Sequence, residues 1–253
     1  MRNVFIFGLG AVLVGVISSP LVADEKEARA VLEKAIKAHG GVEELKKLES
    51  HSAQFSGTIS TNGMDLKFAG EVKAKGSEYF KVAMEIDVNN MNIAIVNVIS
   101  KDKGWAKVAD NIIEMDKDQV AEAMQQGHQN AALNLFPLLD KKYKLSVVGE
   151  EKVNGKDAIC IRVEHPKFRA INICFDKKSY LLVQATSVVK DFQAGEEVTE
   201  VTTMTDHEDK GSRQPKKLTI TRDGKPYITM EVSSYQLNQK FDDKEFSKPS
   251  SDD

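Results

Sequence analysis

The feature that most constrains the fold of this chain is a long series of segments in which apolar and polar residues alternate. Alternate positions from Met64 to Ala74 are apolar or small, and the pattern continues at Phe80, Val82, Met84 and Ile86. Neighbouring residues of a strand point to opposite faces, so this alternation predicts strands with one buried and one solvated face. The dipeptide Asn62-Gly63 is typical of a two-residue hairpin turn. The first strands are therefore expected to pair as hairpins.

Turn residues divide the chain between residues 54 and 237 into about eleven such strands. The later segments are Met91 to Ile99, a β-rich stretch from Trp105 to Ile113, Tyr143 to Val148, Ala158 to His165, Ala170 to Phe175, Leu181 to Val189, Val198 to Thr205, Lys217 to Thr221 and Tyr227 to Leu237. Connections this short favour an antiparallel meander that curls around its apolar face. From Met91 to Ile99 both faces are apolar, so we expect this part of the sheet to be covered on both sides.

Two helices are expected to cover this sheet. The first begins after Asp24 and ends at His39-Gly40-Gly41, and its apolar face comprises Ala28, Val31, Leu32, Ala35 and Ile36. Val42, Leu45 and Leu48 continue as a short further helix. The second helix interrupts the strands, with Asp116 as its N-cap and an apolar face of Val120, Met124, His128, Ala131 and Leu135. Gly127 weakens this helix, which is either a movable cover or a static crossover element.

The first 23 residues have the layout of a cleavable export signal. Arg2 is followed by an uncharged apolar run from Val4 to Ile17, and Pro20 and Ala23 precede the acidic Asp24. The alternative is a membrane anchor, but the run is shorter than the roughly 20 residues that a spanning helix needs. Neither cysteine lies near the cleavage point, so a lipid anchor is not expected. We predict a periplasmic or otherwise exported soluble protein with one domain over residues 24–249 and a disordered tail over 250–253.

Composition excludes some partners. Without the signal the chain keeps 34 of its 35 basic residues against 38 acidic ones, and no basic block stands out. A mildly acidic chain of this kind is a poor ligand for nucleic acid or anionic membranes. We expect a monomer that binds no nucleic acid.

The sequence carries no catalytic or metal-binding motif. It lacks zinc-protease, nucleophile-elbow, phosphate-loop and CxxC patterns, and its five histidines are isolated from one another. His128 alone falls on an apolar helical face, where a partly buried core or rim position is the expected role. The sequence therefore predicts neither an enzyme nor a cofactor or metal site.

The two cysteines fall on strands that pair well in one register. Opposing Cys160 with Cys174 also places Ile161 opposite Ile173, Ile159 opposite Phe175 and Val163 opposite Ile171. Opposed residues of antiparallel strands lie within disulfide range, and an exported chain permits a bridge. We predict a structural Cys160–Cys174 disulfide, with two inert thiols as the alternative.

Several stretches together resemble a known group. They are residues 37–41 with 44–48, residues 175–178 before 181–183, residues 214–219, residues 221–226 and residues 241–249. In this order they resemble the bacterial outer-membrane lipoprotein-sorting proteins of the LolA/LolB-like superfamily. The resemblance implies a half-open antiparallel β-barrel with a helical lid over a hydrophobic cavity. Members carry lipoprotein acyl chains or free lipids, and others regulate envelope-stress signalling. This chain lacks a position matching the LolA lid arginine and has no LolB-type lipid anchor.

Two functional readings follow from this resemblance. The first is a carrier for a lipid or an acylated lipoprotein. The second is a sensor or interaction module whose partner is an envelope membrane protein. For the carrier we predict a ligand cavity lined by strand residues Phe55, Ile59, Leu66, Phe68, Phe80, Val82, Met84 and Ile86 and by helix residues Val120, Met124 and Leu135.

Overall fold

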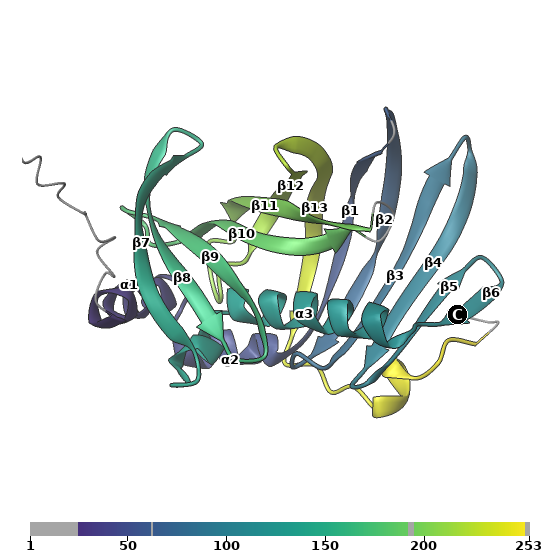
Figure 1. Cartoon of the computed structure of the whole chain (residues 1–253), viewed down its shortest axis with the longest axis horizontal. Coiled ribbons are helices and arrows are strands. Elements are labelled where there is room, and N and C mark those ends of the chain that lie inside the picture. The colour runs from purple at the N-terminus through teal and green to yellow at the C-terminus, as the bar shows by residue number, and fades with distance from the viewer. Residues whose placement is uncertain (1–24, 62, 192–194, 251–253) are drawn as a thin grey trace, which may run out of the picture.

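The sheet that the alternation predicts is present as one open antiparallel layer. The structure, a computed structural model, describes residues 25–61, 63–191 and 195–250, so the signal predicted over residues 1–23 and the tail residues 251–253 lie outside the described residues. Thirteen strands pair in the order β6-β5-β4-β3-β2-β1-β13-β12-β11-β10-β9-β8-β7. The two halves of the chain meet where β1 (Ser50–Thr61) pairs with β13 (Lys225–Leu237), and β6 and β7 form the two edges (Figure 1).

Each half of the chain contributes a run of consecutive hairpins. The first half contains β2 (Met64–Lys75), β3 (Tyr79–Val88), β4 (Met91–Ser100), β5 (Lys103–Val108) and β6 (Asn111–Glu114). The second half contains β7 (Lys144–Val153), β8 (Lys156–His165), β9 (Phe168–Asp176), β10 (Leu182–Asp191), β11 (Glu196–His207) and β12 (Pro215–Arg222). The prediction of about eleven strands was therefore too low. One reason is that the stretch from Trp105 to Ile113 folds into a hairpin of β5 and β6, with Ala109 at φ 50° in its turn.

The N-terminal helices form one end of the main core. Helix α1 (Glu25–Ala38) buries all five residues of its predicted apolar face, and α2 (Val42–Lys46) with the 3-10 turn η1 (Lys47–Glu49) buries Leu45 and Leu48. This core continues into buried residues of β7 to β10, among them Ile161, Ile173 and Phe175. Arg29 fixes α1 to the start of the second half, because its guanidinium donates to the carbonyl oxygens of Leu138 and Tyr143.

Helix α3 (Lys117–Leu133) connects the two edge strands and crosses the hollow of the sheet (Figure 1). Its start is the predicted one, since the Asp116 carboxylate accepts from the Gln119 backbone N–H and the Gln119 side chain accepts from the Asp116 N–H. Its end differs from the prediction. Leu135 lies beyond the helix at φ 61°, ahead of the 3-10 turn η2 (Phe136–Leu139), and is fully buried in the main core.

The sheet has an inner face, which carries Phe55, Phe80 and Leu218 and is turned toward α3, and an opposite outer face. On the outer face a short core of Val96, Val98 and Trp105 lies under Phe246, in the 3-10 turn η3 (Asp243–Phe246) of the C-terminal segment. On the inner face Val120 of α3 comes close to Gly104, which is paired with Ile99. The expectation of cover on both sides from Met91 to Ile99 holds only for the second half of β4, where Val96, Val98 and Ile99 are buried, because Met91 at its start is 64% exposed.

The β8–β9 hairpin has the predicted register. Cys160 is opposite Cys174, Ile161 opposite Ile173 and Val163 opposite Ile171. The two sulfurs form the predicted disulfide, which lies with Val153 and Ala158 in a small cluster on the outer face. The isoleucines point the other way, into the main core. One register therefore satisfies the apolar face and the bridge together.

Candidate functional site

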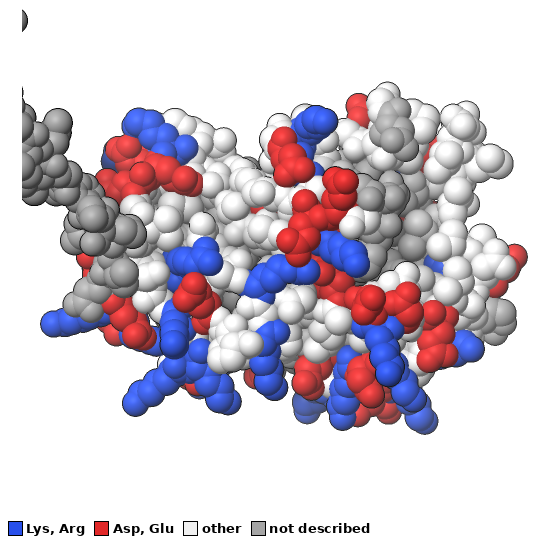
Figure 2. All heavy atoms as spheres, viewed as in Figure 1, with Lys and Arg blue, Asp and Glu red and all other residues white. Residues whose placement is uncertain are grey.

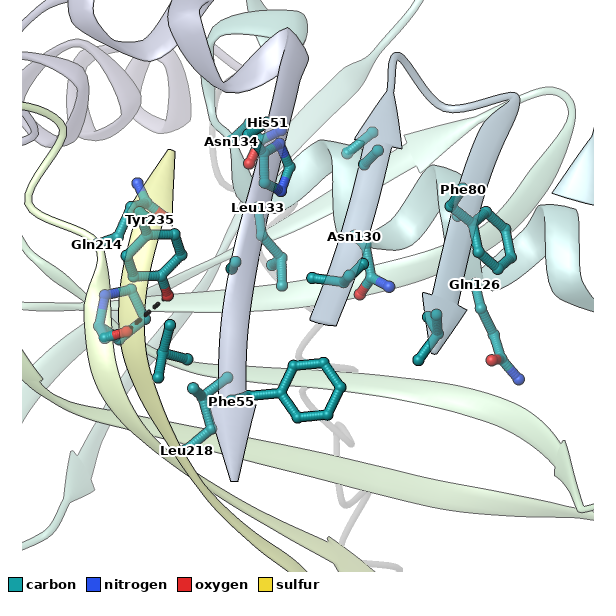
Figure 3. A pocket seen from close by; sticks show the side chains of 18 of the residues that line it. His51, Phe55, Phe80, Gln126, Asn130, Leu133, Asn134, Gln214, Leu218 and Tyr235 are labelled. Carbon is teal, nitrogen blue, oxygen red and sulfur yellow. Dashed lines mark hydrogen bonds between the residues drawn. The ribbon is translucent and has the colours of Figure 1, made fainter. Parts of the chain in front are cut away.

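A cavity of about 400 Å³ lies between α3 and the inner face of the sheet (Figure 3). Its strand wall is mostly apolar and comes from β1, β2, β3, β10, β11, β12 and β13, with Ala53, Phe55, Val72, Ala74, Phe80, Val82, Leu182, Met204, Leu218, Met230 and Val232 among its residues. This volume falls within the roughly 300–1,000 Å³ typical of small-molecule sites. The cavity is the candidate functional site of this chain.

The strand register explains why these side chains meet. Val82 of β3 is opposite Val72 of β2, which is opposite Ala53 of β1. Across the junction of the two halves, Phe55 is opposite Val232. Residues directly opposite one another point to the same face, so each aligned row adds one layer to the wall. The wall is therefore assembled from segments about 180 residues apart in the chain.

A glycine makes room for an aromatic ring on the inner face, next to the cavity. Gly57 is opposite Phe68 and Gly70 is opposite Phe55, and the two rings are 5.8 Å apart. A Cβ added at Gly57 would lie 2.8 Å from the Phe68 ring. The absence of a side chain at Gly57 thus lets the Phe68 ring approach the neighbouring strand closely.

Three of the eight predicted strand residues, Phe55, Phe80 and Val82, line the cavity. The register places the other five on the same inner face, farther along the strands and outside the cavity: Ile59, Leu66, Phe68, Met84 and Ile86. Phe68 is buried and the other four are half-buried. The alternation identified the correct face but not the part of it that α3 covers.

None of the three predicted helix residues lines the cavity. Val120 is buried near the start of α3, Met124 is half-buried, and Leu135 is in the main core. The helix turns a different side to the cavity, made of Gln126, Gly127, Asn130, Ala131 and Leu133, with Asn134 at its C-cap. The predicted apolar stripe of Val120, Met124 and Leu135 is therefore not the cavity-facing side.

Polar contacts set this rotation of α3. Glu122 pairs with Arg169 of β9 at 2.8 Å and accepts from the Lys190 backbone N–H of β10 at 3.0 Å. The Gln125 side chain accepts from the Arg169 backbone N–H at 2.8 Å. His128 stacks on Phe168, with ring centroids 4.7 Å apart. These contacts join one side of α3 to the second half of the sheet.

The opposite side of α3 lies close to the β2–β3 turn. A Cβ added at Gly127 would be 3.0 Å from the Ser77 carbonyl oxygen and 3.5 Å from the Phe80 ring. Gly127 thus permits the close approach of the helix to this turn, besides lowering its helix propensity. Helix α3 is held from both halves of the sheet.

The cavity is electrically neutral near pH 7. Its titratable side chains are His51 and Tyr235. The His51 Nδ1–H donates to the Leu48 carbonyl oxygen, and burial lowers the pKa of this histidine. The Tyr235 hydroxyl donates to the Pro215 carbonyl oxygen at 2.7 Å (Figure 3), and burial raises its pKa. Both groups are therefore uncharged and engaged with backbone acceptors.

Beyond the cavity the inner face ends in an exposed apolar rim. We define this rim as Met64, Met91, Val108 and Ile113, which are 42–64% exposed. They lie near the tips of the first-half hairpins and share the inner face with Leu66, Ile93 and Ile95. Few charged side chains are seen over the tips of β3 to β6 in Figure 2. The apolar wall of the cavity therefore continues to an exposed edge.

The polar part of the lining was not predicted from the sequence: His51, Ser77, Gln126, Asn130, Asn134, Gln214 and Tyr235. A usable signal exists for three of these residues. Gln126, Asn130 and Asn134 are spaced by four residues in a helix otherwise rich in alanine, which places their amides on one side.

Metal ligands have no comparable arrangement among the described residues. The sole group of His, Cys, Asp or Glu atoms close enough to share an ion there is Glu151, Cys160 and Cys174. Both sulfurs are already joined in the disulfide. No helix of the described ranges is long and apolar enough to cross a membrane.

Comparison with known proteins identifies the architecture. No protein-family model and no curated protein sequence matches the chain. A DUF1329 family protein from Desulfovibrio piger is 13% identical with a TM-score of 0.57, and the match covers 87% of this chain and 97% of that protein. A domain assigned as an outer membrane lipoprotein-sorting protein from Vibrio parahaemolyticus is 12% identical, with a TM-score of 0.54 and coverage of 89% and 98%.

A LolA superfamily protein from Nitrosomonas europaea has 14% identity, a TM-score of 0.53 and coverage of 87% and 97%. Identities this low show a shared fold, and function must be argued from the site. The open antiparallel sheet, the crossing helix and these similarities together show that the chain has a LolA/LolB-like fold.

Proposed function

We propose that this chain is a carrier that holds a hydrophobic ligand, a lipid or the acyl chain of a lipoprotein, between the sheet and α3. The observation that carries the proposal is the cavity of about 400 Å³ with its apolar wall, on a LolA/LolB-like fold. Each methylene moved from water into such a wall contributes about 0.8 kcal/mol. Roughly ten buried methylenes would contribute about 8 kcal/mol to the binding free energy. The loss of translational and rotational freedom on association offsets part of this contribution.

The size of the cavity favours a compact ligand. Its volume is near the lower end of the roughly 300–1,000 Å³ range for ligand sites, which fits one acyl chain better than several. A larger lipid would require α3 to move away from the sheet. The contacts of Glu122 and Gln125 with β9 and β10 oppose that movement.

The proposed setting is outside the cytoplasm. The signal predicted over residues 1–23 would export the chain, and the Cys160–Cys174 disulfide suits an oxidising compartment. The mature protein would be periplasmic or otherwise exported, soluble, monomeric and not lipid-anchored. We propose no catalytic step and no cofactor, because the two titratable residues that line the cavity, His51 and Tyr235, donate hydrogen bonds to backbone carbonyl oxygens.

Native mass spectrometry of protein purified without detergent tests the carrier. A reproducible adduct that lipid extraction identifies as a lipid would support it. A direct assay would measure binding of N-phenyl-1-naphthylamine, an uncharged fluorescent probe of apolar cavities. A protein that carries no adduct and binds no probe would contradict the proposal.

A second candidate function is an interaction module that binds an envelope membrane protein. The exposed rim of Met64, Met91, Val108 and Ile113 favours it, because contiguous apolar surface often marks a binding site. Photo-crosslinkers at Met91 and, as a control, at the exposed Lys217 of the outer face would distinguish the two functions in cells. A protein crosslinked from Met91 alone would favour the module, and a lipid crosslinked there would favour the carrier.

A further inference from the structure

The cavity has two chemically different walls. The strand wall presents aliphatic and aromatic side chains such as Phe80, Val82 and Leu218. The helix wall presents the amide row, which we define as Gln126, Asn130 and Asn134. Residues four apart in a helix are separated by about 6 Å along the axis and lie on one side. The row therefore places three amide groups on the cavity side of the helix, of which Gln126 and Asn134 are half-buried and Asn130 is exposed.

The amide row is free to bind a ligand. None of the three side chains makes a hydrogen bond to another residue in the described ranges. Elsewhere on α3, by contrast, Gln119 caps the helix and Gln125 binds the β8–β9 hairpin. Each amide of the row offers both a donor and an acceptor.

Gln126 and Asn130 also border a second cavity of about 70 Å³ beneath β9, β10 and β11. Its one charged lining residue, Glu200, is already paired with Arg222 at 3.0 Å. The side chains of Gln126 and Asn130 thus lie between the large cavity and the small one. Because Glu200 pairs with Arg222, it makes no hydrogen bond to either amide.

No described lysine, arginine, aspartate or glutamate lines the large cavity. An ionised group that enters this cavity loses its hydration shell and finds no oppositely charged side chain to pair with. Its transfer from water therefore costs several kcal/mol. A carboxylate or phosphate would have to remain outside. The lining thus selects against a charged group inside the cavity.

We infer that the ligand segment enclosed by this cavity is uncharged and carries carbonyl or hydroxyl groups beside its apolar chain, as in a neutral acylglycerol. This inference rests on the proposed carrier function and specifies its ligand class. The chain lies on the strand wall, and the ester and hydroxyl groups exchange hydrogen bonds with the amide row.

The test compares two ligands with the same acyl chain at neutral pH, below their micelle concentrations. Monolauroylglycerol is uncharged and bears an ester and hydroxyls, whereas laurate is ionised. Displacement of N-phenyl-1-naphthylamine measures both affinities. We expect monolauroylglycerol to bind the unmodified protein at least about tenfold more tightly than laurate, because the carboxylate has no partner.

A double variant tests the amide row. Gln126→Met and Asn130→Leu keep the side-chain size and remove the amides. One net hydrogen bond is worth roughly a two- to tenfold change in affinity, so the variant should bind monolauroylglycerol about tenfold more weakly. Ala121→Leu adds a leucine on the exposed side of α3 and should change nothing. Circular dichroism confirms that the variants are folded.

The outcomes separate the inference from the function on which it rests. Laurate binding as tightly as monolauroylglycerol overturns the inference and leaves the carrier function standing. Undiminished monolauroylglycerol binding by the double variant also overturns it. If neither ligand nor the fluorescent probe binds the unmodified protein, the carrier function and the inference both fail.

Discussion

Glu122 of α3 and Arg169 of β9 form an ion pair of 2.8 Å whose carboxylate is 3% exposed. The second carboxylate oxygen accepts from the Lys190 backbone N–H, so one side chain joins the helix to two strands. A buried acid in the middle of a covering helix is not what an apolar lid would present. The helix is held by specific polar contacts in addition to apolar packing.

Removing this carboxylate should loosen α3. We expect Glu122→Ala to lower the free energy of unfolding by about 2–3 kcal/mol, because a charge-assisted hydrogen-bond set is lost and Arg169 loses a partner. Glu122→Gln keeps an acceptor for Lys190 and should have about half the effect. Urea unfolding measures the stability, and amide hydrogen exchange over residues 117–133 measures the opening of the helix.

The exposed pair of Arg162 and Glu164 provides the control. The Arg162 Nε and Glu164 Oε1 atoms are 2.9 Å apart, but both side chains are about half exposed. Glu164→Gln should change stability by less than about 1 kcal/mol, since solvent screens such pairs. If Glu122→Ala lowers the free energy of unfolding no more than Glu164→Gln does, the contacts of Glu122 do not hold α3 on the sheet.

His39 should make the fold sensitive to acid. It is 2% exposed, its Nε2 accepts from the Leu182 N–H, and its Nδ1–H therefore donates to the Ser212 carbonyl oxygen. Burial lowers its pKa to about 4, and the nearby His207 and Arg213 act in the same direction. The unfolded chain therefore binds a proton between pH 6.5 and pH 4 that the folded chain does not. Stability is complete above pH 6.5 and falls by up to about 3 kcal/mol as the pH drops to 4.

His39→Gln can retain both hydrogen bonds and cannot titrate. Its unfolding free energy should depend less on pH, with the slope reduced by up to about 1.4 kcal/mol per pH unit between pH 6.5 and 4. Urea unfolding at a series of pH values measures both slopes. Equal slopes in the two proteins would show that another group dominates the acid response.

Local pattern was sufficient for most elements of the fold. Alternation, Asx-Gly turns and the Asp116 cap depend on neighbouring residues, so the helix starts and the Cys160–Cys174 register could be predicted from the sequence. The β5–β6 hairpin was missed because its turn has Ala109 at positive φ and contains no glycine or proline, although Asp110 and Asn111 are residues that turns favour. The pairing of β1 with β13 joins strands from the two ends of the domain, and no pattern among neighbouring residues predicts it.

The site was predicted less well for a physical reason. An apolar stripe shows which side of a helix avoids water only when packing decides the rotation. In α3 the rotation follows Glu122 and Gln125, whose partners are on β9 and β10. Those partners cannot be read from the helix sequence, so Met124 was placed in the cavity and Asn130 was missed.

The disulfide should be complete and stabilising. Cys160 and Cys174 are 14 residues apart, and closing a loop of this length restricts the unfolded chain by about 3 kcal/mol. The exported protein should show no free thiol by intact mass without reductant. Cys160→Ala with Cys174→Ala should lower the unfolding free energy by about 2–4 kcal/mol and leave ligand binding unchanged, since the bridge is on the outer face. Quantitative alkylation of the denatured, non-reduced protein would refute the bridge.

A charge on the inner face should abolish binding without unfolding the sheet. Leu218 and Thr219 are adjacent on β12, but Leu218 lines the cavity and Thr219 is exposed on the outer face. Leu218→Glu places an unpaired carboxylate in the cavity, so affinity for N-phenyl-1-naphthylamine should fall more than about tenfold. Thr219→Glu introduces the same charge and should bind as the unmodified protein does. Equal affinities in the two variants would show that the probe binds elsewhere.

The C-terminal segment should be an integral part of the fold. Phe246 is fully buried against the outer face, where it packs with Val98 and Trp105, the single tryptophan of the chain. Phe246→Ala should cost about 3–5 kcal/mol of unfolding free energy, because it removes a buried ring and leaves a cavity. Trp105 should then become more exposed and its fluorescence emission should shift to longer wavelength. Glu245→Ala, at an exposed ion pair with Lys73, should change neither property appreciably. An unchanged emission spectrum and stability in Phe246→Ala would mean that the segment does not cover Trp105 in solution.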